Sequence, residues 1–159
     1  MDCFELLKQD HDEVDMLLKQ CKEAGADKKG MEVFKKLARS LTVHAKVEEA
    51  VFYPKFREQE ELSSLVEEAY EEHHAVEEML EEMAQMSPGD EEWESKLKEL
   101  KQNIEHHVKE EEQELFPKAS KLISKEEAAE LGETIAEEKK EMLKGKSKVA
   151  KEVFSRLGL

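Results

Sequence analysis

The sequence predicts an all-α fold, an up-down-up-down four-helix bundle with an additional C-terminal helix. Only three prolines and six glycines occur among 159 residues, so few positions interrupt a helix. The apolar residues make up 38% of the chain and recur at steps of three and four, as on one face of an α-helix. This regular spacing argues against disorder, although 41% of the residues are charged.

The first two helices are divided by a glycine-bounded break. We expect the first helix to run from about residue 3 to the segment Gly25–Gly30, "GADKKG". The second should run from about residue 29 to Pro54, or a few residues past it, because proline removes a backbone donor and kinks or ends a helix.

Capping signals mark the third and fourth helices. Ser64 and Glu67 have capping-box spacing at the start of the third helix, which stops at residues 87–90, "SPGD". Asp90 can cap a fourth helix, which runs to about Pro117.

The C-terminal part is also predicted to be helical. Ser124 and Glu127 form another capping box ahead of a fifth helix that fades through the lysine-rich "KGKSK". The final stretch, "VAKEVFSRLGL", is expected to form a short last helix. We interpret residues 1–159 as one domain, with the bundle at about 3–118 and a helical tail at about 124–159.

Each of the four long helices carries an apolar seam that contains one histidine, and two of the seams also contain a glutamate. Followed at steps of three and four, the seams place six polar residues among apolar ones: His11, His44, Glu48, His73, His107 and Glu111. The same phase turns the neighbouring His74 and His106 away from the seams, so we expect both to face water.

The chain also aligns with itself. "QDHDEVDMLL" matches "EEHHAVEEML" and "HAKVEEAVFYP" matches "HVKEEEQELFP", so His11 pairs with His73 and His44 with His107, as in a duplicated helix pair. Short connections favour antiparallel neighbours. All four imidazoles should then lie in one layer, about 12 to 15 Å from one end of the bundle, with the two glutamates one turn nearer that end.

A metal explains this layer better than packing does. Each buried polar group without a partner costs about 1 to 3 kcal/mol, and no lysine or arginine of the seams faces the layer. Four imidazoles and two carboxylates exceed the ligands that one tetrahedral zinc uses, so two adjacent ions bridged by the glutamates fit better. The mixed ligands suit iron or manganese, while zinc and cobalt could occupy the site in vitro.

The same residues resemble a known family. About residues 3–118 resemble the hemerythrin-like (HHE cation-binding) domain. The resemblance rests on two HxxxE motifs followed by "FYP" and "LFP", and on six residues: His11, His44, Glu48, His73, His107 and Glu111. The resemblance implies a non-heme di-iron centre, with two iron ions bridged by the two glutamates and by an oxo or hydroxo oxygen from solvent. It also implies an open position for dioxygen, peroxide or nitric oxide. Manganese or zinc are possible substitutes for iron.

One position departs from the oxygen-carrying members of that family. They have a second histidine on the third helix, four residues after the first, where this chain has Glu77. Glu77 is a possible additional metal ligand, whereas Asp15, four residues after His11, is better explained as a solvated flank. Fewer histidines should favour the ferric state, which argues against stable reversible oxygen carriage. Tyr53 and Tyr70 could hydrogen-bond a bound oxygen species.

Charge and cysteine content limit the partners and the compartment. The net charge of -15 argues against nucleic acid and anionic membrane surfaces as partners. The chain has no apolar run near 18 residues and no secretion signal at its start, so we expect a cytoplasmic protein. Cys3 and Cys21 would lie about 27 Å apart on one helix, too far for a disulfide, and are expected to be reduced and packed.

The leading functional hypothesis is a di-iron protein that reacts with or senses dioxygen, peroxide or nitric oxide, or that reports iron or redox status. It is an enzyme only if peroxide or nitric oxide turns over, and it could use a redox partner protein. Two alternatives remain open. An iron storage or delivery protein must release iron readily, whereas a helical interaction module with a structural metal would accept zinc as well as iron.

Overall fold

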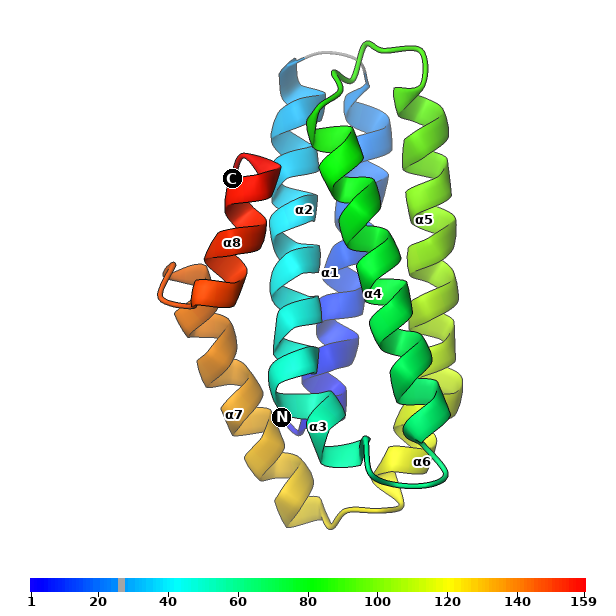
Figure 1. Cartoon of the computed structure of the whole chain (residues 1–159), viewed down its shortest axis with the longest axis vertical. Coiled ribbons are helices and arrows are strands. Elements are labelled where there is room, and N and C mark those ends of the chain that lie inside the picture. The colour runs from blue at the N-terminus through cyan, green and yellow to red at the C-terminus, as the bar shows by residue number, and fades with distance from the viewer. Residues whose placement is uncertain (26–27) are drawn as a thin grey trace.

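The architecture is a four-helix bundle with a two-helix C-terminal arm (Figure 1). The computed structural model describes residues 1–25 and 28–159, and every regular element in those ranges is helical. The predicted break at Gly25–Gly30 includes residues 26 and 27, which lie outside the described residues.

The four long helices alternate in direction, as predicted. They are α1 (Cys3–Ala24), α2 (Lys28–Val47), α4 (Ser63–Ala84) and α5 (Trp93–Glu110). The helical path of α2 ends a few residues past Pro54, as predicted, and that of α5 continues past Pro117. Each passes its proline through a π-helical turn and a short helix: η1 (Glu48–Phe52) with α3 (Tyr53–Phe56), and η2 (Glu111–Leu115) with α6 (Phe116–Ser120).

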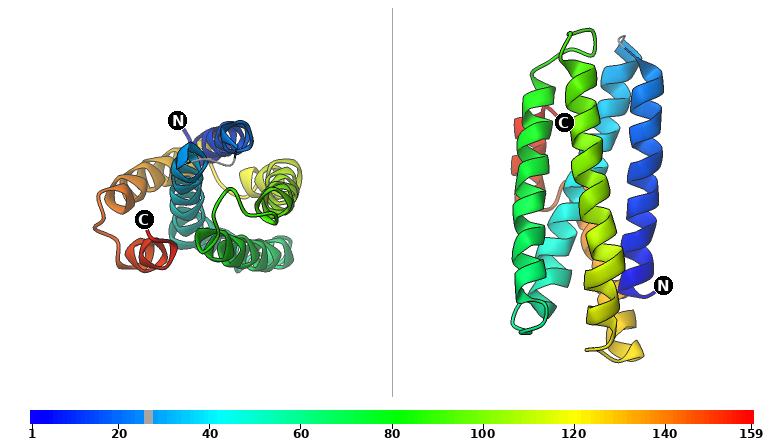
Figure 2. Two further views of the ribbon diagram at one scale, coloured as in Figure 1. Left: turned by 90° about the horizontal axis from the view of Figure 1, so that it is seen from above. Right: turned by 90° about the vertical axis from the view of Figure 1, so that its right-hand side faces the viewer.

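The arm consists of α7 (Lys125–Leu143) and α8 (Lys148–Leu157). The predicted capping box starts α7, since the N–H of Glu127 donates to Ser124 Oγ at 3.1 Å and the Glu127 carboxylate accepts from the N–H of Ser124 at 3.3 Å. Gly132 lets α7 approach closely, because a Cβ there would stand 2.5 Å from a backbone carbonyl oxygen of the N-terminal segment. As a result α7 packs against α1 and α2, and α8 against α2 and α4 (Figure 2).

Two of the predicted helix caps are wrong. Ser64 lies inside α4, whose N-cap is Leu62 and has no side-chain cap bond. The backbone already turns helically before this point, since the N–H of Leu62 donates to the carbonyl of Gln59 at 3.0 Å. Asp90 closes the turn before α5 instead of capping the helix, because its carboxylate accepts from the N–H of Ser87 at 2.8 Å.

The apolar core is divided into two clusters by the histidine layer. One cluster contains Leu7 and Phe52, and the other contains Val14 and Leu80. On α1, for example, His11 lies between Leu7 of the first cluster and Val14 of the second. The polar layer is therefore closed above and below by apolar side chains, which keeps bulk water from it.

The two cysteines are free and buried, as expected for packed thiols. Burial, with the nearby charge of Asp2, raises the pKa of Cys3 to about 12, and burial raises the pKa of Cys21 to about 11. Both thiols therefore stay protonated and weakly reactive at neutral pH. In the described ranges, no helix combines the length and the apolar character that crossing a bilayer requires.

Candidate metal centre

The structure brings the four predicted histidines together as two pairs inside the bundle. The rings of His11 and His44, from α1 and α2, have centroids 4.9 Å apart, and those of His73 and His107, from α4 and α5, have centroids 4.8 Å apart. Each of these residues is at most 8% exposed. The histidines of the four seams thus meet in the core.

Glu48 and Glu111 lie between the two pairs. Glu48 Oε1 is 3.1 Å from His44 Nε2 and 3.0 Å from His73 Nε2. Glu111 Oε1 is 3.0 Å from His11 Nε2 and 3.4 Å from His107 Nε2. Each carboxylate therefore contacts one histidine of each pair, which is the arrangement that two bridging carboxylates require.

Both glutamates stand at the start of a π-helical turn. The N–H of Tyr53 donates to the carbonyl of Glu48, and the N–H of Phe116 donates to the carbonyl of Glu111, five residues back in each case. The wider turn lets the helix continue past a proline that supplies no donor, six residues after each glutamate. These turns were not predicted from the sequence, although the two prolines at equal spacing are their signal.

Each histidine is also supported on its outer side by a carboxylate. The Nδ1 atoms lie 2.6 to 3.0 Å from carboxylate oxygens, in the pairs His11 with Glu112, His44 with Asp10, His73 with Glu49, and His107 with Glu72. An Nδ1–H that donates to a carboxylate fixes the ring and directs Nε2 toward the centre. All four Nε2 atoms are thus presented to the space around Glu48 and Glu111.

The supporting carboxylates repeat in the two halves of the chain, and sequence analysis missed them. An acid directly precedes the first histidine of each half, and another directly follows each HxxxE glutamate. The preceding acid, Asp10 or Glu72, supports the second histidine of its own half. The following acid, Glu49 or Glu112, supports the first histidine of the other half. The two halves therefore complete each other.

One substitution breaks this internal symmetry. Tyr53 Oη donates to Glu111 Oε2 at 2.6 Å and lies 3.1 Å from Glu48 Oε1 and 3.2 Å from His73 Nε2. The equivalent residue of the other half is Phe116, whose ring stacks parallel to His11 with centroids 6.0 Å apart. Burial and the two glutamates raise the pKa of Tyr53 well above its usual value, so the phenol keeps its proton. Tyr70 packs beside Tyr53 but outside the centre.

The charges of the centre are strongly coupled. Burial alone would lower the pKa of His44, but Glu48 and Asp10 override it and raise that pKa to about 10. The pKa values of His73 and His107 are raised in the same way, against burial, by neighbouring glutamates. Burial opposes ionisation of Glu48, but the surrounding histidines lower its pKa well below the usual value. In metal-free protein these histidines therefore tend to stay protonated, and a cation that binds them would displace the protons.

The ligand atoms fit a cation. Two buried groups of ligand atoms could each hold an ion, His11, His44, Glu48 and Glu111 in one, and Glu48, His73 and His107 in the other. A third group, Glu68, Glu72, His106 and Glu110, is partly exposed and lies outside the centre. Within the described ranges, His44 Nε2 and Glu48 Oε2 are among the few buried side-chain atoms without a hydrogen-bond partner, since the 3.1 Å contact of His44 Nε2 with Glu48 Oε1 lacks hydrogen-bond geometry. Such orphaned atoms cost about 1 to 3 kcal/mol each, and a cation would satisfy both.

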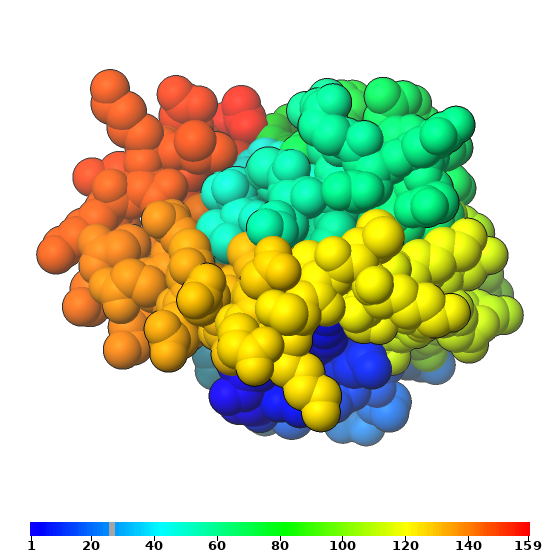
Figure 3. Space-filling view, turned by 90° about the horizontal axis from the view of Figure 1, so that it is seen from below, coloured from blue at the N-terminus to red at the C-terminus, as the bar shows by residue number. Residues whose placement is uncertain are grey.

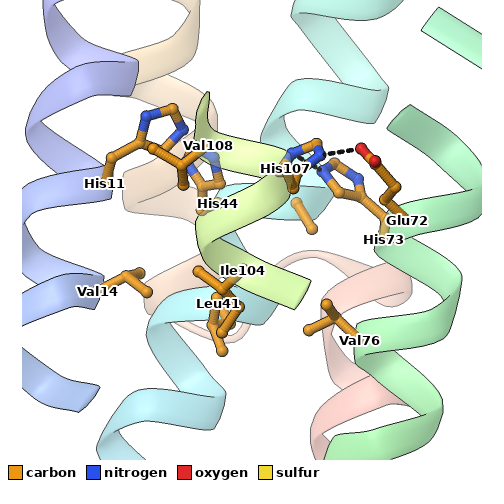
Figure 4. A pocket seen from close by; sticks show the side chains of 11 residues that line it. His11, Val14, Leu41, His44, Glu72, His73, Val76, Ile104, His107 and Val108 are labelled. Atoms are coloured by element: carbon orange, nitrogen blue, oxygen red, sulfur yellow. Dashed lines mark hydrogen bonds and ion pairs between the residues drawn. The ribbon is translucent and has the colours of Figure 1, made fainter. Parts of the chain in front are cut away.

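A small apolar chamber adjoins the four histidines, and Glu72 is the one carboxylate among the described residues of its lining. Its volume is about 40 Å³, and Val14, Leu41, Val76 and Ile104 line it below the four rings (Figure 4). A space of this size has room for a water molecule or a diatomic ligand.

Other candidates from the sequence lie outside the centre. Glu77 contacts Arg156 at 2.6 Å and Lys46 at 3.4 Å. Asp15 is exposed and pairs with Lys19 at 3.1 Å. His74 and His106 are exposed, as their helical phase predicted.

Comparisons with known proteins identify the family and the fold. The family model of the hemerythrin HHE cation binding domain matches residues 3–119, so the chain belongs to this family of cation-binding domains. A hemerythrin HHE cation binding domain-containing protein from Mycobacterium kansasii has the same fold, with a TM-score of 0.80, 22% identity, and coverage of 96% of this chain and 99% of that one. A DNA nickase from Nostoc sp. strain PCC 7120 is 28% identical over 127 residues, which are 80% of this chain but 36% of the nickase. The chain thus spans about a third of the length of that curated relative.

Removing one supporting carboxylate should weaken metal binding. Glu72→Leu deletes the acceptor for His107 Nδ1 and is expected to lower Co²⁺ affinity by about 10- to 100-fold, because the ring loses its orientation and basicity. Competition with a chromophoric chelator measures the change. The matched control is Glu71→Leu, which removes the same charge from an exposed neighbour on α4 and should leave the affinity unchanged. Equal affinities for the two variants would contradict the supporting role of Glu72.

Metal-free protein should lose stability as the pH rises. The pKa of His44 is raised from 6.5 to about 10 on folding, so its stabilisation is full below pH 6.5 and is lost toward pH 10. The pKa values of Glu48 and Glu111 are lowered on folding, so the stabilisation that these carboxylates contribute is present above about pH 4.5 and is lost as the pH falls below it. Thermal denaturation after chelation is thus expected to give a higher Tm at pH 5.5 than at pH 9.5. A Tm that rises over this range would contradict the assignment.

Proposed function

We propose that the chain is a di-iron protein whose centre reacts with or senses dioxygen, peroxide or nitric oxide. The observation that carries the proposal is the pair of buried glutamates, each in contact with one histidine of both pairs. This arrangement favours two adjacent ions over one. The two carboxylates face two separate pairs of imidazoles, and each pair can serve as ligands of its own ion.

The proposed ligands divide between two positions. His11 and His44 would hold one ion, His73 and His107 the other, and Glu48 and Glu111 would bridge them. Imidazole and carboxylate together suit iron or manganese better than Mg²⁺ or Ca²⁺, which prefer oxygen alone. When bound, iron would supply one-electron redox chemistry and an open coordination position for a small ligand.

The protein's own residues would shape that chemistry. Tyr53 holds a proton at Oη within hydrogen-bond distance of Glu111 and Glu48, where it can donate to an oxygen atom in the centre. The apolar chamber beside the histidines offers room for a ligand of diatomic size.

Two observations narrow the proposal. Glu77 stands where oxygen-carrying hemerythrins have a further histidine, and its carboxylate is engaged by Arg156 and Lys46, which disfavours a reversible oxygen carrier. The name DNA nickase belongs to a protein of which this chain matches 36%, and a net charge of -15 disfavours contact with a phosphate backbone. Nicking of DNA is therefore not part of the proposal.

The proposal predicts about two iron ions per chain in anaerobically prepared protein, with near-ultraviolet absorption bands that appear on exposure to air. His44→Ala and Glu111→Ala should lose this iron and lower the Tm, because each removes a ligand from the layer. His74→Ala and His106→Ala are the matched controls and should keep both the iron and the spectrum, since these rings are exposed. Iron content is measured by elemental analysis.

Three results would count against the proposal. A single zinc with no spectral change in air would favour a helical module with a structural metal. Two irons that leave readily and show no response to dioxygen, peroxide or nitric oxide would favour iron storage or delivery. Loss of iron from the His74→Ala or His106→Ala variants would show that the proposed ligands are wrong.

A further inference from the structure

The C-terminal arm closes two of the four seams of the bundle. α7 lies over α1 and α2, and α8 lies over α2 and α4, so the arm occupies the side of the bundle away from α5 (Figure 2). The segment that leads from α6 into α7 lies across one end of the bundle, beside the start of α1 (Figure 3). The seams on either side of α5 remain uncovered by the arm.

A cleft opens along the seam between α1 and α5 and reaches the centre. Its volume is about 270 Å³, and its lining includes Asp12 and Asp15 near solvent and Glu112 and His11 at its inner end. It shares His11, Ile104 and Val108 with the chamber beside the histidines. The imidazole of His11 therefore stands between the cleft and the chamber.

Carboxylates continue along this cleft from solvent to the buried ligands. Asp12 and Asp15 are exposed, and the side chain of Glu112 is 33% exposed while it accepts from His11 Nδ1 at 2.6 Å. His11 Nε2 in turn lies 3.0 Å from Glu111, which is 2% exposed. Four residues of the lining carry carboxylates, Asp12, Asp15, Glu105 and Glu112, against one ammonium, that of Lys109. From outside the lining, Lys19 pairs with Asp15 at 3.1 Å and Lys101 with Glu105 at 3.8 Å, so the excess of negative charge rests on Asp12 and Glu112.

The other uncovered seam has a cavity that is separate from the chamber. A cavity of about 350 Å³ lies between α4 and α5, and its lining includes Glu68, Glu110 and Glu114. None of its lining residues belongs to the chamber beside the histidines. His106 also lines this cavity and is exposed, and its Nε2 lies 3.3 Å from both Glu72 and Glu110.

We infer that divalent cations reach the centre through the cleft between α1 and α5, attracted by Asp12 and Asp15 and passed by Glu112 and His11 to the buried ligands. The inference rests on the proposed metal centre. Carboxylates in a cleft with low-dielectric walls raise the local cation concentration and the association rate. Oxygen ligands at the mouth also replace part of the hydration shell before the ion meets imidazole nitrogen.

The rate of metal uptake tests the route separately from the centre. Metal-free protein is mixed with excess Co²⁺ in a stopped-flow spectrometer, and the association rate and final Co²⁺ content are both measured. The Asp12→Asn, Asp15→Asn double variant is expected to associate roughly tenfold more slowly at low salt, with less difference at high salt and an unchanged final content. The matched control, Glu68→Gln with Glu114→Gln, removes two negative charges beside the other seam and should keep the wild-type rate.

Each remaining outcome overturns the route. Equal slowing of both double variants would indicate a general effect of net charge, and slowing of the control alone would assign uptake to the seam between α4 and α5. Unchanged rates in both would show that Asp12 and Asp15 take no part. Absence of Co²⁺ binding by the wild-type chain would remove the proposed centre, and the route with it.

Discussion

The burial of four imidazoles and two carboxylates in one layer of a helical core is the constraint on which the rest of the structure depends. Removing one partner from such a buried set costs about 3 to 5 kcal/mol, because the remaining charge is left without compensation. Here every imidazole is held at Nδ1 by an outer carboxylate and faces Glu48 or Glu111 with Nε2. The helices must therefore keep axial positions that hold these atoms within hydrogen-bond distance of one another. The two apolar clusters on either side of the layer maintain those positions.

The duplicated pattern of the chain explains how so many polar groups are satisfied at once. Each half supplies two histidines, one bridging glutamate and two supporting acids, and half of that support crosses to the other half. One half alone could not supply a supporting acid to both of its own histidines, because the partner of its first histidine comes from the other half. The substitution of Tyr53 for the phenylalanine of the other half makes the two positions chemically unequal, since only the His73 side has a phenol within 3.2 Å.

Periodicity was sufficient to predict the helices and the inward histidines. It separated His73 from His74 and His107 from His106 because a helical step of one residue turns a side chain by about 100°. The supporting acids could not be predicted in this way. Asp10, Glu49, Glu72 and Glu112 lie on the flanks of acidic helices, where spacing does not distinguish a solvated carboxylate from one that reaches a neighbouring helix.

Other features depended on contacts that are distant in sequence. Glu77 has the sequence position of a ligand, but Arg156 from α8 engages its carboxylate, and no local pattern predicts that pairing. The π-helical turns follow from prolines that the helices pass instead of ending, which a rule about helix ends does not foresee. The start of α4 depends on a backbone turn before Leu62, so the serine cap predicted there was unnecessary.

The most direct test of the account is anomalous diffraction at the iron edge from crystals of the iron-loaded chain. The account predicts two iron peaks, one beside Nε2 of His11 and His44 and the other beside Nε2 of His73 and His107, with Glu48 and Glu111 between them. A single peak, or peaks that lie away from either histidine pair, would contradict it.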